Sequence, residues 1–334
     1  MNDFSSGQGA VLFVEDTTLI ARGVTVEQAK EESARLLEVA ELWFLANKLK
    51  LNEDKTNILH VRIYTFLLLS LVDVQTQLDA ELDLNQRTHL DRCCLQRLAR
   101  LPVQYILGEW EFRGLTLSMR APVFIPRPET EQLIDVVLAE QSQLESPPAC
   151  IVELGCGSGA ISIALATAYP QAKIYAIEAS EEACNLAKEN CRRLELCERV
   201  HVMNAKLMSN GSLLNGSMPD CVDVLVSNPP YIKTADITSL QPEITLYEDL
   251  RALDGGMDGM QVVGALLLLL VSSKPCNAGK GITLYMEIDP SLYEPIRQWT
   301  LDKRNLGVQF GNIYKDIYAV DRFMSVHKVD KYIR

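Results

Sequence analysis

From residue 150 to the C-terminus, short apolar runs alternate with segments of helical periodicity, and this alternation limits the possible folds more than any other feature. The expected strands are 151–154, 172–177, 200–203, 222–227 and 283–287. The expected helices are 158–168, 181–194, 261–272 and 291–302. Strands joined by helical crossovers pair in parallel, and the helices cover both faces of their sheet. The sequence therefore predicts an α/β fold with a mostly parallel sheet.

The residues before this region predict smaller elements. We expect helices at 63–82 and 86–101, the second with Asn85 as its N-cap. Residues 105–119 alternate apolar and polar side chains around two glycines, a pattern that is typical of a β-hairpin. A rigid turn then leads into a helix at 129–143. A small helical region and a hairpin thus precede the α/β part of the chain.

The chain is acidic, with 44 Asp and Glu against 32 Lys and Arg among 334 residues, which gives a net charge of −12. Proteins that bind nucleic acid through its phosphates need a basic face. The longest apolar run, Val262–Val271, is about half of the roughly 20 residues that a membrane-spanning helix needs. We therefore expect neither direct nucleic-acid binding nor a membrane span.

The nine cysteines include no Cys-x-x-Cys pair of the kind that binds zinc. The four histidines are scattered along the chain, without a partner at a useful spacing. In a chain of this size with an apolar core, reduced thiols in a reducing compartment are the expected state of the cysteines. We predict no metal site.

A glycine-rich turn, Glu153-Leu154-Gly155-Cys156-Gly157-Ser158-Gly159, joins a predicted strand to a predicted helix. Glycine permits both the tight turn and the close approach of a ligand to the backbone. Glu178 ends the next strand, where its carboxylate is placed to accept both hydroxyls of a ribose. Nucleotide dehydrogenases share such a turn, and a purely structural turn is the plain alternative. The Glu-x-Gly-x-Gly-x-Gly form fits S-adenosylmethionine better than a dinucleotide.

The tetrad Asn228-Pro229-Pro230-Tyr231 follows an apolar strand, at the end where open α/β sheets bind ligands. A tetrad of this kind suits the methylation of a planar NH2 group. The nitrogen of an amide is a poor nucleophile because its lone pair is delocalised into the carbonyl. The Asn228 side-chain oxygen and the Pro229 carbonyl oxygen can accept the two N–H hydrogens of a planar NH2 group, while Tyr231 packs over its plane. Alignment of the two reactants can lower the activation barrier by as much as about 7–11 kcal/mol. A loop made rigid by its prolines is the structural alternative.

Together with the segment before them, these motifs resemble the HemK/PrmC family, the glutamine N5-methyltransferases of peptide chain release factors. The stretches that carry the resemblance are residues 101–134, 152–166, 222–232 and 247–260. The resemblance implies a class I, Rossmann-like methyltransferase fold with a mostly parallel seven-stranded sheet. It also implies S-adenosylmethionine as cofactor and, as protein substrate, a release factor whose Gly-Gly-Gln motif carries the methylated glutamine.

The resemblance also assigns roles to residues of this chain. Those implied for binding of the cofactor are Phe124, Arg127, Pro128, Thr130, Glu153, Gly155, Cys156, Gly157, Ser158, Gly159, Glu178 and Asn228. Those implied for catalysis are Asn228, Pro229 and Tyr231, and the whole tetrad, including Pro230, is implied to bind the substrate glutamine. The turn Asp254-Gly255-Gly256 is placed near this site.

The chain departs from the family pattern in three places. Lys206, followed by Leu207, stands where the family has an acidic residue that meets the adenine. The C-terminal pattern Asp-x-x-Gly-x-x-Arg is present as Asp316–Arg322 but lacks the glycine. The N-terminal helical domain that recognises the release factor is shortened or replaced.

The replacement itself has a resemblance. Residues 11–23 and 43–59 are similar to the palm and following helix of non-LTR retrotransposon reverse transcriptases, with strands expected at 11–20 and a helix at 26–49. Those enzymes hold two metal ions with paired aspartates, whereas the corresponding turn here has Glu15 before Asp16. The remaining parts of a polymerase are missing, so we expect this fragment to be inactive.

The predicted organisation is therefore a reverse-transcriptase-like fragment at 1–60, a helical region at 61–102, a hairpin linker at 103–124 and a methyltransferase domain at 125–334. Two alternatives to glutamine methylation stay open. One is an amino-methyltransferase acting on adenine or guanine of RNA or DNA, which the same tetrad serves, and the other is a catalytically impaired chimera. The resemblance implies a mitochondrial location, but no transit peptide is visible in the acidic N-terminus, so a cytoplasmic location is also possible.

Overall fold

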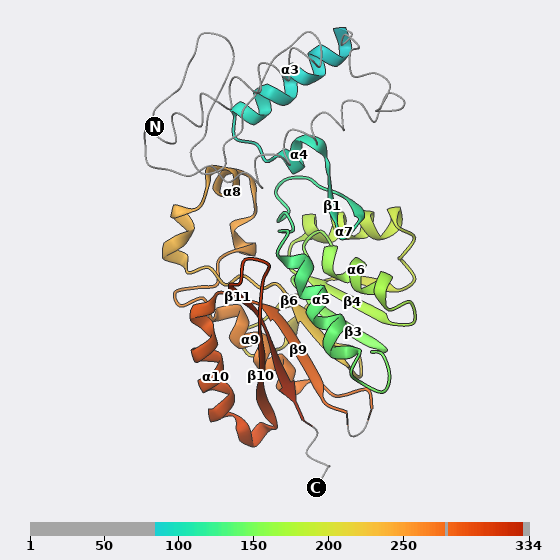
Figure 1. Ribbon diagram of the computed structural model, residues 1–334, viewed down its shortest axis with the longest axis vertical. Helices are drawn as coiled ribbons and strands as arrows, with labels where there is room; N and C mark the ends of the chain where they lie inside the picture. The colour runs from blue at the N-terminus through green and yellow to red at the C-terminus, as the bar shows by residue number, and fades with distance from the viewer. Residues whose placement is uncertain (1–83, 278–279, 330–334) are drawn as a thin grey trace. The chain divides into compact units, whose positions relative to one another are not determined.

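The computed structural model describes residues 84–277 and 280–329. The chain divides into two compact units, residues 1–106 and 107–334. Helix α3 (Leu84–Leu98) belongs to the first unit, and α4 (Val103–Leu107) ends at the boundary (Figure 1). Asn85 lies inside α3, so the prediction that it caps this helix was wrong. The predicted strands at 11–20, the helices at 26–49 and 63–82, and the reverse-transcriptase-like fragment lie outside the described residues.

A seven-stranded sheet forms the centre of the second unit, with the strand order β10-β11-β9-β8-β3-β4-β5. Its strands are β3 (Cys150–Leu154), β4 (Lys173–Glu178), β5 (Val200–Asn204), β8 (Val224–Ser227), β9 (Ile282–Glu287), β10 (Val308–Lys315) and β11 (Asp321–Lys328). The five strands from β9 to β5 are parallel, and β11 pairs antiparallel with both β9 and β10. The predicted, mostly parallel sheet is confirmed, whereas β10 and β11 are not among the predicted strands.

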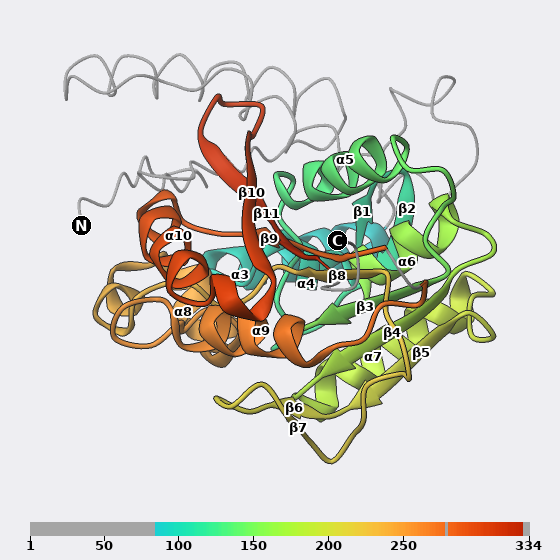
Figure 2. The same cartoon turned by 90° about the horizontal axis from the view of Figure 1, so that it is seen from below.

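Helices cover both faces of this sheet, each over its own apolar cluster (Figure 2). One face is covered by α5 (Thr130–Gln141), α6 (Ala160–Ala168) and α7 (Glu181–Arg193). The other is covered by α9 (Gln261–Ser272) and α10 (Tyr293–Asp302). Between these two layers β3 is buried along its whole length, which explains why its sequence is an unbroken apolar run apart from Glu153. No helix in the described part of the chain has the length and apolar character that crossing a membrane requires.

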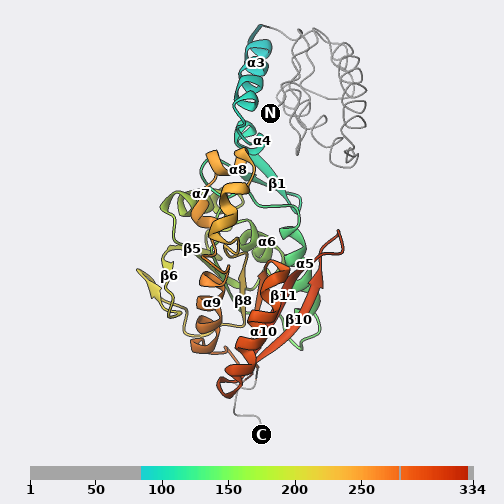
Figure 3. The same ribbon diagram turned by 90° about the vertical axis from the view of Figure 1, so that its left-hand side faces the viewer.

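Short elements connect the layers. They are β6 (Lys206–Leu207), β7 (Leu213–Leu214), α8 (Pro242–Tyr247) and the 3-10 helices η1 (Thr234–Ser239), η2 (Leu250–Ala252), η3 (Pro290–Leu292) and η4 (Arg304–Leu306). The predicted helix at 291–302 therefore begins as η3, where Asp289 caps the turn by accepting from the Ser291 N–H. The hairpin formed by β10 and β11 extends outward from the sheet (Figure 3).

The predicted hairpin at 105–119 is present as β1 (Glu109–Phe112) paired with β2 (Leu115–Ser118), while residues 105–107 are helical. The fully buried Asn190 of α7 attaches it to the core. Its Oδ1 accepts from the Ser118 N–H at 2.7 Å, and its Nδ2 donates to the carbonyls of Ser118 at 3.2 Å and Ser158 at 3.0 Å. One side chain thus ties the hairpin to the loop that precedes α6.

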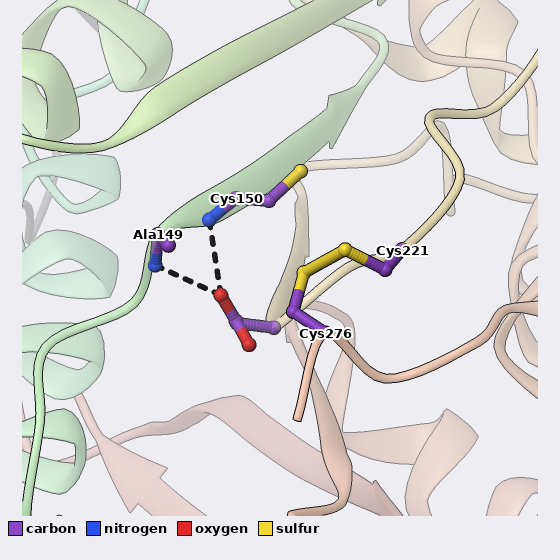
Figure 4. The surroundings of a disulfide bond; sticks show 5 residues. Ala149, Cys150, Cys221 and Cys276 are labelled. Carbon is purple, nitrogen blue, oxygen red and sulfur yellow. Dashed lines mark hydrogen bonds between the residues drawn. A yellow bond between two sulfur atoms is a disulfide. The ribbon is translucent and has the colours of Figure 1, made fainter. Parts of the chain in front are cut away.

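A disulfide joins Cys221 and Cys276, which precede the neighbouring strands β8 and β9 (Figure 4). The expectation that all cysteines are reduced was therefore wrong for this pair. The two residues are 55 positions apart in sequence, and only the pairing of β8 with β9 brings their Cα atoms to 4.6 Å. Beside them Asp223 Oδ2 accepts from the N–H groups of Ala149 and Cys150, at the start of β3.

Replacing Asn190 tests how the β1–β2 hairpin is attached to the core. Asn190→Ala leaves the backbone groups of Ser118 and Ser158 without their buried partners, so the free energy of unfolding should fall by about 2–4 kcal/mol. Arg193→Ala is the matched control, because the same helix also reaches the hairpin through an exposed ion pair to Glu109 at 3.0 Å. Loss of this ion pair should lower the free energy of unfolding by less than about 1 kcal/mol, as measured by urea denaturation. Equal losses for the two variants would contradict this role of Asn190.

Candidate active site

Three neighbouring strands end at the same edge of the sheet. β8 pairs in parallel with β3 on one side and with β9 on the other, so their carboxyl ends lie together. Ser227, the last residue of β8, donates its hydroxyl to the Leu154 carbonyl at the end of β3, at 2.7 Å. The glycine-rich loop after β3 and the tetrad after β8 are therefore at adjacent strand ends.

The glycine-rich loop is hydrogen-bonded to the neighbouring strand β4. Gly155 donates its N–H to the Ile177 carbonyl at 2.8 Å. Gly155 and Gly157 have φ values of 74° and 53°, in the region that favours glycine, and a Cβ at either position would meet no atom within 4 Å. The loop backbone therefore faces open space, into which a ligand can approach the peptide plane.

Glu178, at the end of β4, reaches this loop. Its Oε2 accepts from the Gly157 N–H at 2.9 Å, and its Oε1 accepts from the Ser180 N–H at 2.8 Å. Each carboxylate oxygen has a further lone pair. The half-buried carboxylate is thus held at the edge of the open loop with acceptor capacity left, which fits the ribose hydroxyls of S-adenosylmethionine.

Other residues of the predicted cofactor set are turned into the core. Cys156 and Ser158 are buried, and Glu153 is 1% exposed. The Glu153 carboxylate accepts a hydrogen bond from the Ser162 hydroxyl of α6. Burial raises the pKa of Glu153 to about 8, against the lowering effect of the hydrogen bond from Ser162. The side chain of Glu153 therefore supports the glycine loop from the side of the core. Its partner Ser162 is a residue that sequence reasoning missed.

The turn at 124–130 is fixed by a buried carboxylate from a distant segment. Glu248, directly after α8, accepts from the Arg127 guanidinium at 2.7 Å and from the Ile125 N–H at 3.1 Å. The same guanidinium lies over the Phe124 ring, 4.6 Å from its centroid. Pro128 is exposed. The structure thus brings Phe124 and Arg127 together, and the conformation of the turn depends on Glu248.

Thr130 begins α5 beside the tetrad. Asn228 donates its Nδ2 to the Thr130 hydroxyl oxygen at 3.1 Å. That hydroxyl donates in turn to Glu287 Oε2 at 2.7 Å. The Asn228 Oδ1 has no hydrogen-bond partner among the residues that the structure describes, so it is free to accept from a substrate.

Tyr231 is held by the same carboxylate. Its hydroxyl donates to Glu287 Oε1 at 3.2 Å. Burial and the charge of Glu287 both raise the pKa of the Tyr231 phenol, which therefore stays protonated and acts as a donor. Glu287, the last residue of β9, is a site residue that sequence reasoning missed, although its place at the end of a predicted strand was a usable signal.

The turn Asp254-Gly255-Gly256 packs against the tetrad, as the resemblance implied. Gly255 donates its N–H to the Ile232 carbonyl at 2.7 Å, and a Cβ on Gly255 would lie 2.8 Å from the Tyr231 Cα. Only a residue without a side chain allows this approach. The prolines of the tetrad are enclosed to different degrees, because Pro229 is buried and Pro230 is half-buried.

The departures from the family pattern have structural counterparts. Lys206 is exposed in β6. In the C-terminal pattern, Arg322 donates to the buried Asp316 carboxylate at 2.6 Å across the β10–β11 turn. Ala319 stands where the pattern has glycine and adopts a φ of 60°, a conformation that glycine takes without steric penalty. The ion pair of this pattern is therefore kept without its glycine.

Comparison with known proteins adds to this geometry. Residues 136–246 match the family model described as "Methyltransferase small domain". A human protein named MTRF1L release factor glutamine methyltransferase is 39% identical over 241 residues, which cover 70% of this chain and 69% of its own length. The release factor glutamine methyltransferase of Synechocystis is 35% identical over 229 residues, covering 68% of this chain and 73% of its own.

Solved structures are more distant. The N-terminal domain of human METTL16, in complex with SAH, matches 81% of this chain and 93% of its own, with a TM-score of 0.46 and 14% identity.

The buried carboxyl of Glu153 predicts a dependence of stability on pH. Its pKa of about 8 lies above the usual value of 4.5, so between these values the folded protein keeps a proton that the unfolded chain releases. The free energy of unfolding therefore falls as pH rises through this window. Glu153→Gln removes this dependence, and its stability relative to the wild type should increase by up to about 1.4 kcal/mol per pH unit. Urea denaturation across the window measures this, and a constant difference would contradict it.

Proposed function

Because this chain belongs to the release factor glutamine methyltransferase family, we propose that it methylates the side-chain nitrogen of a glutamine in a peptide chain release factor. The cofactor is S-adenosylmethionine, and the glutamine is that of the Gly-Gly-Gln motif. The observation that carries this proposal is the Asn228 amide, which is fixed by Thr130 through its nitrogen and leaves its oxygen unpartnered among the described residues. That oxygen is the acceptor that a carboxamide NH2 group requires.

When bound, S-adenosylmethionine would supply the methyl group of its positively charged sulfur to the glutamine nitrogen, with S-adenosylhomocysteine as the second product and the amide proton released to water. The glycine loop, which is open at Gly155 and Gly157, and the Glu178 carboxylate would hold its adenosyl part. The segment from Phe124 to Thr130 would cover it, with its conformation held by Glu248. The exposed Lys206 leaves the adenine contact without the acidic residue that the family has.

The residues of the tetrad act by position rather than by acid–base chemistry. The Asn228 Oδ1 and the Pro229 carbonyl oxygen would accept the two N–H hydrogens of the glutamine amide. Both acceptors draw electron density toward the nitrogen and orient its lone pair. Tyr231, whose hydroxyl is tied to Glu287, would pack against the carboxamide plane. Alignment of this kind can supply as much as about 7–11 kcal/mol of the barrier, so no strong base is needed before attack.

The remaining parts of the proposal concern the rest of the chain. We propose that residues 1–60, which resemble a reverse transcriptase fragment, take no part in methyl transfer, and that the protein acts in mitochondria. A chain without residues 1–60 that loses methylation activity would contradict the first statement. Import of a C-terminally tagged chain into isolated mitochondria tests the second, and its exclusion from them would contradict it.

Incubation with S-adenosylmethionine and an intact release factor, followed by mass spectrometry, tests the activity. One methyl group should appear on the glutamine of the Gly-Gly-Gln motif, because the free Asn228 oxygen fits the NH2 group of a carboxamide. A release factor with that glutamine replaced by alanine is the control. Methyl transfer to this control, or to RNA or DNA without any protein substrate, would reject the proposal in favour of another target.

Replacing Asn228 separates catalysis from cofactor binding. Asn228→Ala removes an acceptor for the glutamine amide, and kcat should fall at least about 100-fold because the nitrogen loses its orientation. Binding of S-adenosylhomocysteine, measured by calorimetry, should change little, since the glycine loop and Glu178 are untouched. Asn312→Ala, at an exposed position of β10, is the matched control. Parallel loss of binding and turnover in Asn228→Ala would contradict the role given to Asn228.

A further inference from the structure

Glu287 is a buried carboxylate that joins two parts of the site. It ends β9, is 2% exposed, and contacts neither the glycine loop nor Glu178 through any hydrogen bond within the described residues. Its two oxygens have different partners, Thr130 at 2.7 Å and Tyr231 at 3.2 Å. A buried carboxylate is costly unless its oxygens are hydrogen-bonded. One of its partners begins α5, and the other is the last residue of the tetrad.

The direction of these hydrogen bonds determines how the Asn228 amide is turned. Both carboxyl oxygens of Glu287 accept from hydroxyl groups, Oε2 from Thr130 and Oε1 from Tyr231, so the single hydroxyl hydrogen of Thr130 points toward Glu287. The Thr130 oxygen then has only lone pairs to offer Asn228, which therefore presents its NH2 group to Thr130. The Asn228 oxygen is consequently turned the other way, toward the position of the substrate amide.

Without this carboxylate the amide has no preferred direction. The Thr130 hydroxyl could then donate to the Asn228 oxygen, and the amide would rotate by half a turn. Its NH2 group would face the NH2 group of the glutamine, donor against donor. Burial raises the pKa of Glu287, and the hydrogen bonds from Thr130 and Tyr231 and the nearby charge of Arg322 offset this only in part.

We propose that Glu287 and Thr130 are positioning residues of the methyl-transfer site, which orient the Asn228 amide so that its oxygen, and not its nitrogen, meets the substrate carboxamide. The inference rests on the proposed function for the identity of that substrate. It assigns Thr130 to orientation of the tetrad rather than to binding of the cofactor. Because Glu287 also holds the Tyr231 hydroxyl, one carboxylate orients both the amide and the aromatic ring of the tetrad.

Paired substitutions at Thr130 test the relay. Thr130→Val keeps the shape of the side chain but removes the hydroxyl, and kcat should fall about 100-fold, as expected for a misaligned reactant. Thr130→Ser keeps the hydroxyl and should restore kcat to within about threefold of the wild type. The KM for S-adenosylmethionine and the affinity for S-adenosylhomocysteine should stay unchanged in both. A Thr130→Val enzyme with wild-type kcat, or one whose cofactor affinity falls as much as its kcat, would overturn the inference.

Glu287→Gln is the second variant. Thr130 and Tyr231 donate to different oxygens of Glu287, and in glutamine one of these two positions holds an NH2 group that cannot accept, so one of the two hydrogen bonds is lost. We expect a fall in kcat between those of Thr130→Ser and Thr130→Val, again without a change in cofactor affinity. A Glu287→Gln enzyme whose kcat equals that of the wild type would show that the carboxylate orients neither group.

A spectroscopic measurement separates this inference from the proposed function. In protein labelled on asparagine nitrogen, the side-chain NH2 signal of Asn228 is identified by its loss in Asn228→Ala. Its protection from solvent exchange should be kept in Thr130→Ser and lost in Thr130→Val. If the two variants differ in this way but the wild type does not methylate a release factor, the proposed function is refuted and the role of Glu287 and Thr130 in orienting Asn228 stands. Equal protection in the two Thr130 variants would refute the relay, whatever the substrate.

Discussion

The parallel pairing of β8 between β3 and β9 is the constraint on which the rest of the site depends. Because parallel strands end at the same edge, this pairing places the glycine loop, the tetrad and Glu287 next to one another although they are far apart in sequence. The hydrogen bond from Ser227 to the Leu154 carbonyl fixes the first two of these strand ends relative to each other. The helices on both faces keep this edge in place by burying the strands behind it.

Buried carboxylates define the shape of this edge. Glu153 supports the glycine loop through Ser162, Glu248 fixes the turn that begins at Phe124, and Glu287 orients Thr130 and Tyr231. Each is costly to bury and is retained with hydrogen-bond partners from a different segment of the chain. The reaction that the family performs needs little acid–base chemistry, because a carboxamide nitrogen is limited by orientation and electron delocalisation. Rigid placement of neighbouring residues is therefore enough to explain why these three glutamates are buried. Their hydrogen-bond partners are positioned by them and need not carry protons.

Most of the fold could be predicted from the sequence because its elements have local signals. The strands β3, β4, β5, β8 and β9 are mostly apolar runs, and the glycine loop and tetrad lie directly at the ends of two of them. Asn85 was misassigned as a cap because a polar residue in a helix has the same local appearance as one before it. The β10–β11 hairpin lacks a turn motif of the usual kind, since Ala319 takes the left-handed conformation where glycine is the common signal.

The parts of the site that could not be predicted depend on contacts between distant segments. Glu287 lies 157 positions from Thr130, and Glu248 lies 121 positions from Arg127, so neither pairing leaves a pattern in the sequence. The disulfide between Cys221 and Cys276 likewise follows from strand pairing and not from cysteine spacing. The implied residues of the glycine loop, Glu178 and the tetrad lie at strand ends, and the other implied residues lie in the turn at 124–130, whereas the residues that orient them became visible only in the folded chain.

The most direct measurement of the central claim is a crystal structure of the protein with S-adenosylhomocysteine and a peptide that contains the Gly-Gly-Gln motif. The account predicts that the glutamine nitrogen lies about 2.8–3.2 Å from both Asn228 Oδ1 and the Pro229 carbonyl oxygen, on the side that faces the cofactor sulfur. A glutamine bound elsewhere, or an Asn228 amide whose oxygen is turned toward Thr130, would contradict this arrangement.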